Sequence, residues 1–99
     1  MNEVLIIIPT YNEGENIIKI IESIFIIHQD INVLVVDDNS PDGTSSKVKE
    51  VISKFNNKLN LITRKSKMGL GTAYLEGFNW AINNNFSYII SMDADFSHN

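Results

Sequence analysis

Apolar residues occur in short continuous blocks, and between the blocks they recur every three or four positions. A short block that is apolar throughout indicates a strand buried on both faces. Four such blocks predict four strands, at Val4–Ile8, Val33–Val36, Leu59–Thr63 and Tyr88–Met92.

The segments between the strands have the spacing of amphipathic helices. The first helix is predicted to begin at Asn12, with Glu15 placed three positions later as in a capping box. Asn83–Asn85 is expected to end the third helix, because asparagine tolerates the left-handed conformation. The inward stripes of the three helices are predicted to be Ile17, Ile20, Ile21, Ile24 and Ile27; Val48, Val51, Ile52 and Phe55; and Tyr74, Phe78, Ala81 and Ile82.

The alternation of strands and helices predicts an α/β fold with a mostly parallel sheet between two layers of helices. We expect the strand order 3-2-1-4, with a switch point between the first and fourth strands. The 99 residues have room for a single domain.

Composition narrows the classes of function. The net charge is −4, and an acidic chain lacks the basic footprint of a nucleic-acid binder. The absence of cysteine excludes disulfides and thiolate metal sites. No signal peptide is recognisable, and no segment approaches the about 20 apolar residues of a membrane span. We expect a cytoplasmic protein, or a peripheral one on the cytoplasmic face of a membrane.

Clusters of chemically useful side chains follow all four strands. They are Pro9–Glu13, Asp37–Asn39, Arg64–Lys67 with Gly69–Gly71 behind it, and Asp93–Asp95. Parallel strands place their carboxyl ends along one edge of a sheet, where open α/β folds bind ligands. The four clusters are therefore predicted to form one site.

Asp93 and Asp95 are two positions apart at a strand end, so their side chains share a side. Two adjacent carboxylates repel each other unless a cation lies between them or one is protonated. Hard oxygen ligands of this kind suit Mg²⁺ or Mn²⁺. The alternative is an aspartate-rich turn facing solvent.

The other clusters allow a functional and a structural interpretation. Of Asp37 and Asp38, we expect one to accept hydrogen bonds from a ribose or base and the other to cap the following turn. Arg64, Lys65 and Lys67 are three of only eight basic residues and suggest phosphate contact, or a solvated loop. The glycines at 69–71 predict a tight turn and close packing at a helix start.

Tyr11 and Glu13, in the first cluster, also have two interpretations. Tyr11 can stack on a base or pack at the helix entrance. Glu13 can bind a ligand or favour the helix N-terminus.

Four segments together resemble family 2 glycosyltransferases. They are Pro9–Glu13, Val35–Thr44, Gly69–Tyr74 and Met92–His98. Within that family, Ser-Pro-Asp-Gly-Thr and Asp-Ala-Asp-Phe-Ser-His are most similar to the branch of dolichyl- and polyprenyl-phosphate mannose synthases. The resemblance runs from about Val4 to the last residue.

The resemblance implies a GT-A fold and inverting sugar transfer that depends on Mg²⁺ or Mn²⁺. It implies GDP-mannose as the donor and a polyprenyl phosphate as the acceptor, with Asp93 and Asp95 as catalytic residues and Asp95 the firmer metal ligand. By position, the nucleotide-sugar would be bound by Pro9, Tyr11, Glu13, Val36, Asp38, Asp93, Ala94 and Asp95.

In this family an acceptor-binding half is expected to follow. The 99 residues would then be a nucleotide-sugar-binding half that does not turn over alone, and any association with a membrane surface would come from the missing part.

Three alternatives stay open from the residues. The chain is an enzyme of the same family that uses a UDP-sugar, a nucleotide-binding remnant without catalysis, or a two-component receiver-like domain. A receiver would use Asp37 and Asp38 as its acidic pair and Asp93 as the phosphorylated residue. Against the receiver, the acidic pair follows the second strand here and not the first.

Overall fold

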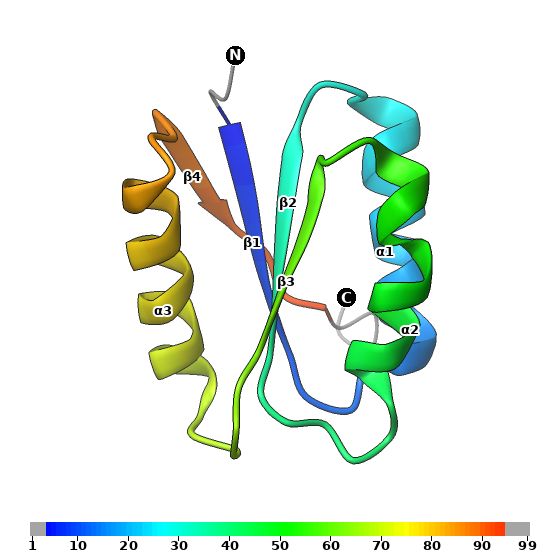
Figure 1. Cartoon of the computed structure of the whole chain (residues 1–99), viewed down its shortest axis with the longest axis vertical. Helices are drawn as coiled ribbons and strands as arrows, with labels where there is room; N and C mark the ends of the chain where they lie inside the picture. Colours follow the sequence, from blue (N-terminus) through cyan, green and yellow to red (C-terminus); the bar gives the residue numbers. More distant parts are fainter. Residues whose placement is uncertain (1–3, 95–99) are drawn as a thin grey trace.

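The computed structural model describes residues 4–94 and contains one four-stranded sheet (Figure 1). The strand order is β3-β2-β1-β4, and every neighbouring pair is parallel. The predicted order and the parallel pairing are both confirmed. The strands are β1 (Val4–Thr10), β2 (Asn32–Asp37), β3 (Leu59–Thr63) and β4 (Tyr88–Ser91).

Helices cover both faces of the sheet and give the three predicted layers. In Figure 1, α1 (Gly14–Ile27) and α2 (Thr44–Val51) lie on one side, and α3 (Leu70–Asn83) lies on the other. Strand β1 supplies both cores, because successive strand residues point to opposite faces. Ile6 and Ile8 pack in the core under α1, and Leu5 and Ile7 pack in the core under α3.

Helix α1 begins two residues later than predicted, and its cap comes from another loop. Asn12 has a left-handed backbone (φ 57°), so it stands outside the helix, and no capping box forms. The carboxylate of Asp42 instead accepts a hydrogen bond from the Gly14 N–H at 3.1 Å. The Thr44 hydroxyl accepts the Glu13 N–H at 3.2 Å. The loop after β2 therefore fixes where α1 starts.

The predicted helical stripes are correct in the middle of the helices and wrong at two ends. Ile27 is 70% exposed and Ile82 is 65% exposed, because each lies in the last turn of its helix. Helix α2 gives way at its end to a 3-10 turn, η1 (Ile52–Phe55). Asn85 has a positive φ of 65° just after α3, as expected for the end of that helix.

Among the glycines, the one packed closely against the sheet is Gly77, and not the predicted Gly69 and Gly71. A Cβ atom at Gly77 would lie 2.8 Å from Cγ2 of Ile7, whereas one at Gly71 would meet no atom within 4 Å. Gly69 has a φ of 99°, a conformation that favours glycine, so the predicted turn before α3 is confirmed. Glycine at 77 lets α3 pack directly on β1.

Candidate functional site

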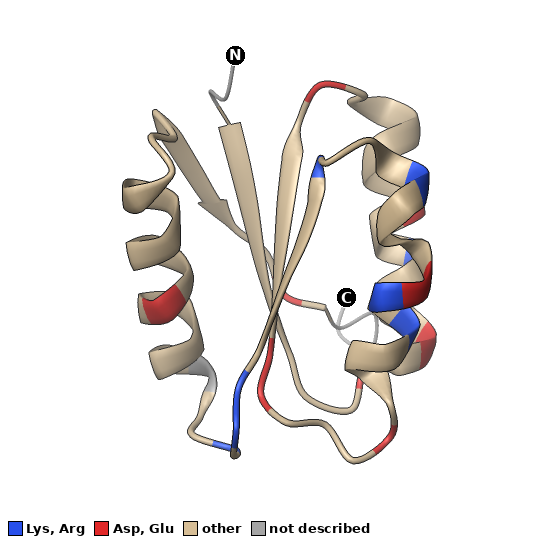
Figure 2. Cartoon of the chain, in the orientation of Figure 1, with Lys and Arg blue, Asp and Glu red and all other residues tan. Residues whose placement is uncertain are grey.

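The carboxyl ends of all four strands lie along one edge of the sheet, the lower edge in Figure 1. The loops after β1, β2 and β3 and the residues after β4 therefore meet there, as the sequence predicted. Figure 2 shows basic residues of this edge on the loop after β3 and acidic residues on the other segments. We call this edge the carboxyl rim.

Asp37 connects several segments of the carboxyl rim through hydrogen bonds. Its carboxylate is buried and accepts hydrogen bonds from the hydroxyls of Thr10 (2.7 Å), Ser40 (2.6 Å) and Ser45 (3.0 Å). It also accepts the Ser40 N–H at 3.0 Å. Asp37 therefore performs the turn-capping role predicted for one member of the aspartate pair.

Asp38 connects the loop after β2 to the loop before α3. Both of its oxygens accept the Met68 N–H at 3.0 Å, and Oδ2 accepts the Gly69 N–H at 2.8 Å. The residue is only 1% exposed. The role predicted for Asp38 in binding a nucleotide stays a prediction, and the structure shows that its carboxylate also shapes the loop at 64–69.

Arg64 is buried beneath that loop. Its Nη2 donates to the Thr72 hydroxyl at 2.6 Å. Its Nε lies 3.4 Å from Asp38 and 3.5 Å from Glu76, close enough for ion pairing although the angles do not make hydrogen bonds. Because the guanidinium is held in this way, the predicted phosphate contact rests on Lys65 and Lys67, which are exposed.

Tyr11 and Lys67 meet across the carboxyl rim. The ammonium nitrogen of Lys67 lies 4.1 Å from the centroid of the Tyr11 ring. Glu13, on the same loop as Tyr11, accepts a hydrogen bond from the Asn16 side chain at 3.3 Å. The helix-start role of Glu13 is thus visible, and its predicted ligand contact stays a prediction.

Pro9 and Val36 lie beside each other near the carboxyl ends of β1 and β2. They are register partners on β1 and β2, and both are buried. Val36 packs in the core under α3. These two residues therefore shape the surface above them and present little side-chain area to a ligand.

Asp93 is exposed at the end of β4 and is held by a tyrosine. The Tyr74 hydroxyl donates to its carboxylate at 3.0 Å. Burial raises the pKa of Tyr74, and the hydrogen bond and negative charge of Asp93 raise it further. Ala94 is buried in the core under α1. Asp95 lies outside the described residues.

The described residues offer few ligands to a divalent cation. Within residues 4–94, no three histidine, aspartate or glutamate side chains lie close enough together to hold a metal ion. Asp93 is a hard oxygen donor facing solvent, which suits Mg²⁺ or Mn²⁺. Such ions commonly take one or two carboxylates and complete their coordination shell with phosphate oxygens and water. Asp93 can supply one such carboxylate.

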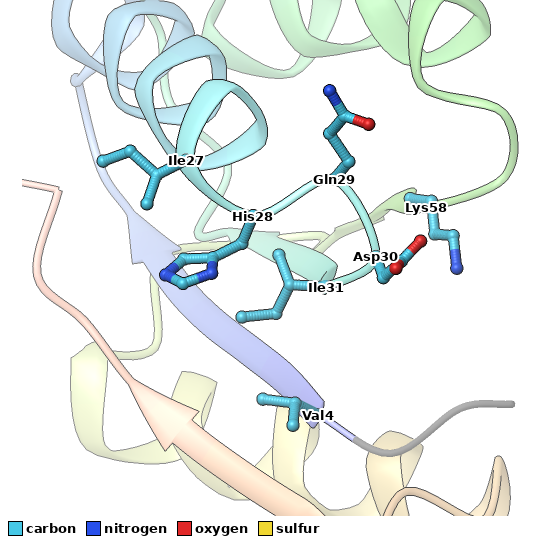
Figure 3. A pocket seen from close by; sticks show the side chains of 7 residues that line it. All are labelled: Val4, Ile27, His28, Gln29, Asp30, Ile31 and Lys58. Atoms are coloured by element: carbon cyan, nitrogen blue, oxygen red, sulfur yellow. The ribbon is translucent and has the colours of Figure 1, made fainter.

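A hollow of about 710 Å³ lies at the opposite edge of the sheet, near the amino ends of β1, β2 and β3 (Figure 3). His28, Asp30 and Lys58 are its ionisable residues, with Val4, Ile27, Gln29 and Ile31 completing the lining. Its volume alone would make this hollow a candidate binding site. We place the site at the carboxyl rim because the buried polar network and the clustered loops are there.

Along the described part of the chain, the helices are too short or too polar to cross a bilayer.

Two contacts at the carboxyl rim were not predicted. Tyr74 was assigned to a helix stripe, yet its hydroxyl reaches Asp93. Asp42 entered only as part of the Ser-Pro-Asp-Gly-Thr motif, yet it caps α1. Both partners are distant in sequence, so no local pattern marks them.

The chain belongs to glycosyl transferase family 2, whose family model matches residues 5–99. It is 44% identical over 94 residues to a polyprenol monophosphomannose synthase of Mycolicibacterium smegmatis, covering 95% of this chain and 36% of that protein. It is 41% identical over 98 residues to a dolichol-phosphate mannosyltransferase of Pyrococcus furiosus, covering 97% of this chain and 26% of that protein. The chain thus spans well under half the length of these relatives.

Solved structures support the GT-A fold. The mannosyltransferase PcManGT from Pyrobaculum calidifontis, in complex with GDP-Man and Mn²⁺, matches with a TM-score of 0.71 at 29% identity. That match covers 94% of this chain and 27% of the other. TarS from S. aureus matches with a TM-score of 0.75 at 26% identity, covering 94% of this chain and 16% of the other. Family membership favours the glycosyltransferase hypothesis over the receiver-like alternative.

Proposed function

We propose that residues 1–99 are the nucleotide-sugar-binding part of an inverting glycosyltransferase that transfers mannose from GDP-mannose to a polyprenyl phosphate. The observation that carries the proposal is the convergence of the four strand-end clusters on one rim of a GT-A sheet. The names of the relatives support the choice of mannose and of a polyprenyl acceptor. The GDP-Man complex of PcManGT supports the donor.

The nucleotide is proposed to lie over Pro9–Glu13 and Asp38, with its base away from Asp95. Tyr11 is half-buried, and we propose that its ring, which Lys67 contacts in the absence of ligand, stacks on the base. Asp38 acts there by fixing the backbone of Met68 and Gly69, so the loop that borders the base is shaped before ligand arrives. A preformed loop lowers the ordering cost of binding.

The diphosphate is proposed to lie toward Asp93 and Asp95, which would hold Mg²⁺ or Mn²⁺. A bound divalent ion neutralises the negative charge that develops on the leaving diphosphate. Tyr74 keeps the Asp93 carboxylate in one orientation through its 3.0 Å hydrogen bond. The acceptor phosphate is already anionic at neutral pH, so its attack on the anomeric carbon needs no strong general base. A polyprenyl acceptor would bring the complete enzyme to a membrane surface.

Calorimetry of GDP binding, with Mn²⁺ and with EDTA, tests the proposal on the chain and on its Asp95→Asn and Asp93→Asn variants. The two carboxylates and the diphosphate would together supply the ligands of one Mn²⁺ ion. Mn²⁺ should therefore tighten GDP binding by about 5- to 150-fold. Asp95→Asn should remove most of this gain and Asp93→Asn part of it. Asp30→Asn, an exposed change at the opposite edge, should leave it intact.

Equal GDP affinity in EDTA and Mn²⁺ would refute the metal site. A parallel titration with UDP that shows tighter binding than GDP would favour the UDP-sugar alternative within the family.

A further inference from the structure

Lys67 and Tyr11 form the contact at the carboxyl rim that links the loop after β3 to the loop after β1. The Lys67 nitrogen stands 4.1 Å from the ring centroid, a cation–π distance. The backbone on both sides of this contact is anchored. Asp38 holds the Met68 N–H that follows Lys67, and the Ser40 hydroxyl accepts the N–H of the residue after Tyr11 at 2.8 Å. The side chains can therefore move while their loops stay in place.

Among residues 4–94, the ammonium of Lys67 has no carboxylate partner, unlike the guanidinium of Arg64. Within residues 4–94, the salt bridges join Arg64 to Asp38 and to Glu76, and Lys67 takes part in none. Lys67 is exposed, and its ammonium, which carries three N–H donors, lies over the electron-rich ring of Tyr11. An exposed cation–π contact contributes little, about 0.5–1 kcal/mol, so a better acceptor displaces it easily.

We propose that Lys67 is a specificity-determining residue that selects guanine at this site. The proposal rests on the proposed function, in which the base stacks on Tyr11. A base on that ring face displaces the ammonium to the edge of the base, within reach of its flexible four-carbon stem. The residue then donates hydrogen bonds to whatever acceptors that edge presents.

Base chemistry explains why the selected base is guanine. Guanine presents two neighbouring acceptors, O6 and N7, which a lysine ammonium can satisfy together. Adenine places an amino donor beside N7, and cytosine presents an amino donor, so each sets a donor against the donors of Lys67. On the corresponding edge, uracil offers one carbonyl acceptor, O4, because its second carbonyl, at C2, lies elsewhere on the ring. The expected order of preference is guanine, then uracil, then adenine and cytosine.

The test compares Mn²⁺-supported binding of GDP, ADP and 7-deaza-GDP to the chain and to Lys67→Met, Lys67→Arg and Lys65→Met. Lys67→Met should weaken GDP binding about tenfold and leave ADP nearly unchanged, the size of one good base contact. Lys67→Arg should keep most of the preference for GDP. Lys65→Met, on the same loop but without the ring contact, should change GDP and ADP by the same factor. The unsubstituted chain should bind 7-deaza-GDP more weakly than GDP.

Three results would overturn the assignment while GDP binding itself persists. Equal weakening of GDP and ADP in Lys67→Met would mean that the ammonium contacts phosphate. Equally tighter binding of GDP and ADP to Lys67→Met would mean that the ammonium only competes with the base for the Tyr11 ring. Unchanged affinity for both nucleotides would mean that the ammonium does not contact the bound nucleotide. If the unsubstituted chain binds none of the nucleotides, the proposed function itself fails, and this inference fails with it.

Discussion

The Oδ1 atom of Asp38 lies 3.4 Å from the Nε atom of Arg64, and the two side chains are 1% and 4% exposed. Asp38 comes from the loop after β2 and Arg64 from the residue after β3, so the pair joins two neighbouring loops of the carboxyl rim. Removing one member of a buried ion pair leaves a charge without compensation.

Asp38→Asn is expected to lower the free energy of unfolding by about 3 kcal/mol. The substitution leaves the Arg64 charge with only Glu76, which is half-exposed, and weakens the acceptor for the Met68 and Gly69 amides. Urea denaturation followed by circular dichroism measures the loss, with Asp30→Asn as the control. A loss below about 1 kcal/mol would mean that the Asp38–Arg64 pair does not stabilise the loop at 64–69. Loss of nucleotide affinity in this variant therefore requires a separate stability measurement before it identifies a ligand contact.

The cap that Asp42 gives to α1 should make stability depend on pH. Burial alone would raise the pKa of Asp42, but hydrogen bonds from Thr44 and Gly14 and the charge of Lys47 outweigh it and hold the pKa below 3.8. Because the folded pKa lies below the unfolded one, the stabilisation is present above 3.8 and disappears as the pH falls through the folded pKa. Asp42→Ala should cost about 1 kcal/mol at about pH 6 and less at about pH 2.5.

Denaturant unfolding at the two pH values measures this difference. Asp42→Asn provides the matched control, since an asparagine oxygen still caps but does not titrate. An identical cost for Asp42→Ala at both pH values would show that the carboxylate charge is irrelevant to the cap.

Two glycines of α3 provide a matched pair for the packing of that helix on β1. Alanine gains about 0.5–1 kcal/mol over glycine from helix propensity. At Gly71, where the added methyl group meets nothing within 4 Å, Gly71→Ala should show that gain. At Gly77, the methyl group would lie 2.8 Å from Ile7, and overpacking costs about 1–3 kcal/mol. Thermal unfolding should therefore place Gly77→Ala below Gly71→Ala in stability, and the reverse order would contradict the close contact.

Tyr74→Phe is expected to weaken metal binding in the presence of GDP while leaving the fold intact. The substitution deletes the hydroxyl that donates to Asp93 at 3.0 Å but keeps the ring, which stacks on Phe78 with centroids 6.4 Å apart. Loss of a group that orients a metal ligand commonly costs about tenfold in affinity. Titration of Mn²⁺ by electron paramagnetic resonance measures the change. Tyr88→Phe, on the exposed part of β4, should not reproduce it.

The sheet could be predicted because its information is local. A buried parallel strand needs apolar residues throughout, and Val4–Ile8 and Val33–Val36 satisfy this without reference to the rest of the chain. Strand order followed from the alternation with helices and the rule that ligand-binding sheets have a switch point. The position of the carboxyl rim then followed directly, since a strand's direction fixes where its last residue lies.

The details of the site could not be predicted, because they depend on contacts between loops. Asp37 and Asp38 are adjacent and identical in type, and only the fold decides that one holds Thr10 and the other holds Met68. The start of α1 was misplaced for the same reason, since its capping residue is 28 positions away. Local propensity contains no term for such a partner.

The position of β1 between β2 and β4 has a consequence for the order of events during synthesis. Val4 pairs with Tyr88, so one edge of the most apolar strand stays open until nearly all the described chain has been made. At roughly 5–20 residues per second, that interval is about 4–16 s on the ribosome. An isoleucine-rich strand with an unpaired edge is a template for aggregation. The nascent chain therefore passes through a vulnerable period whose end is set by the arrival of β4, and slow translation before residue 88 would lengthen it.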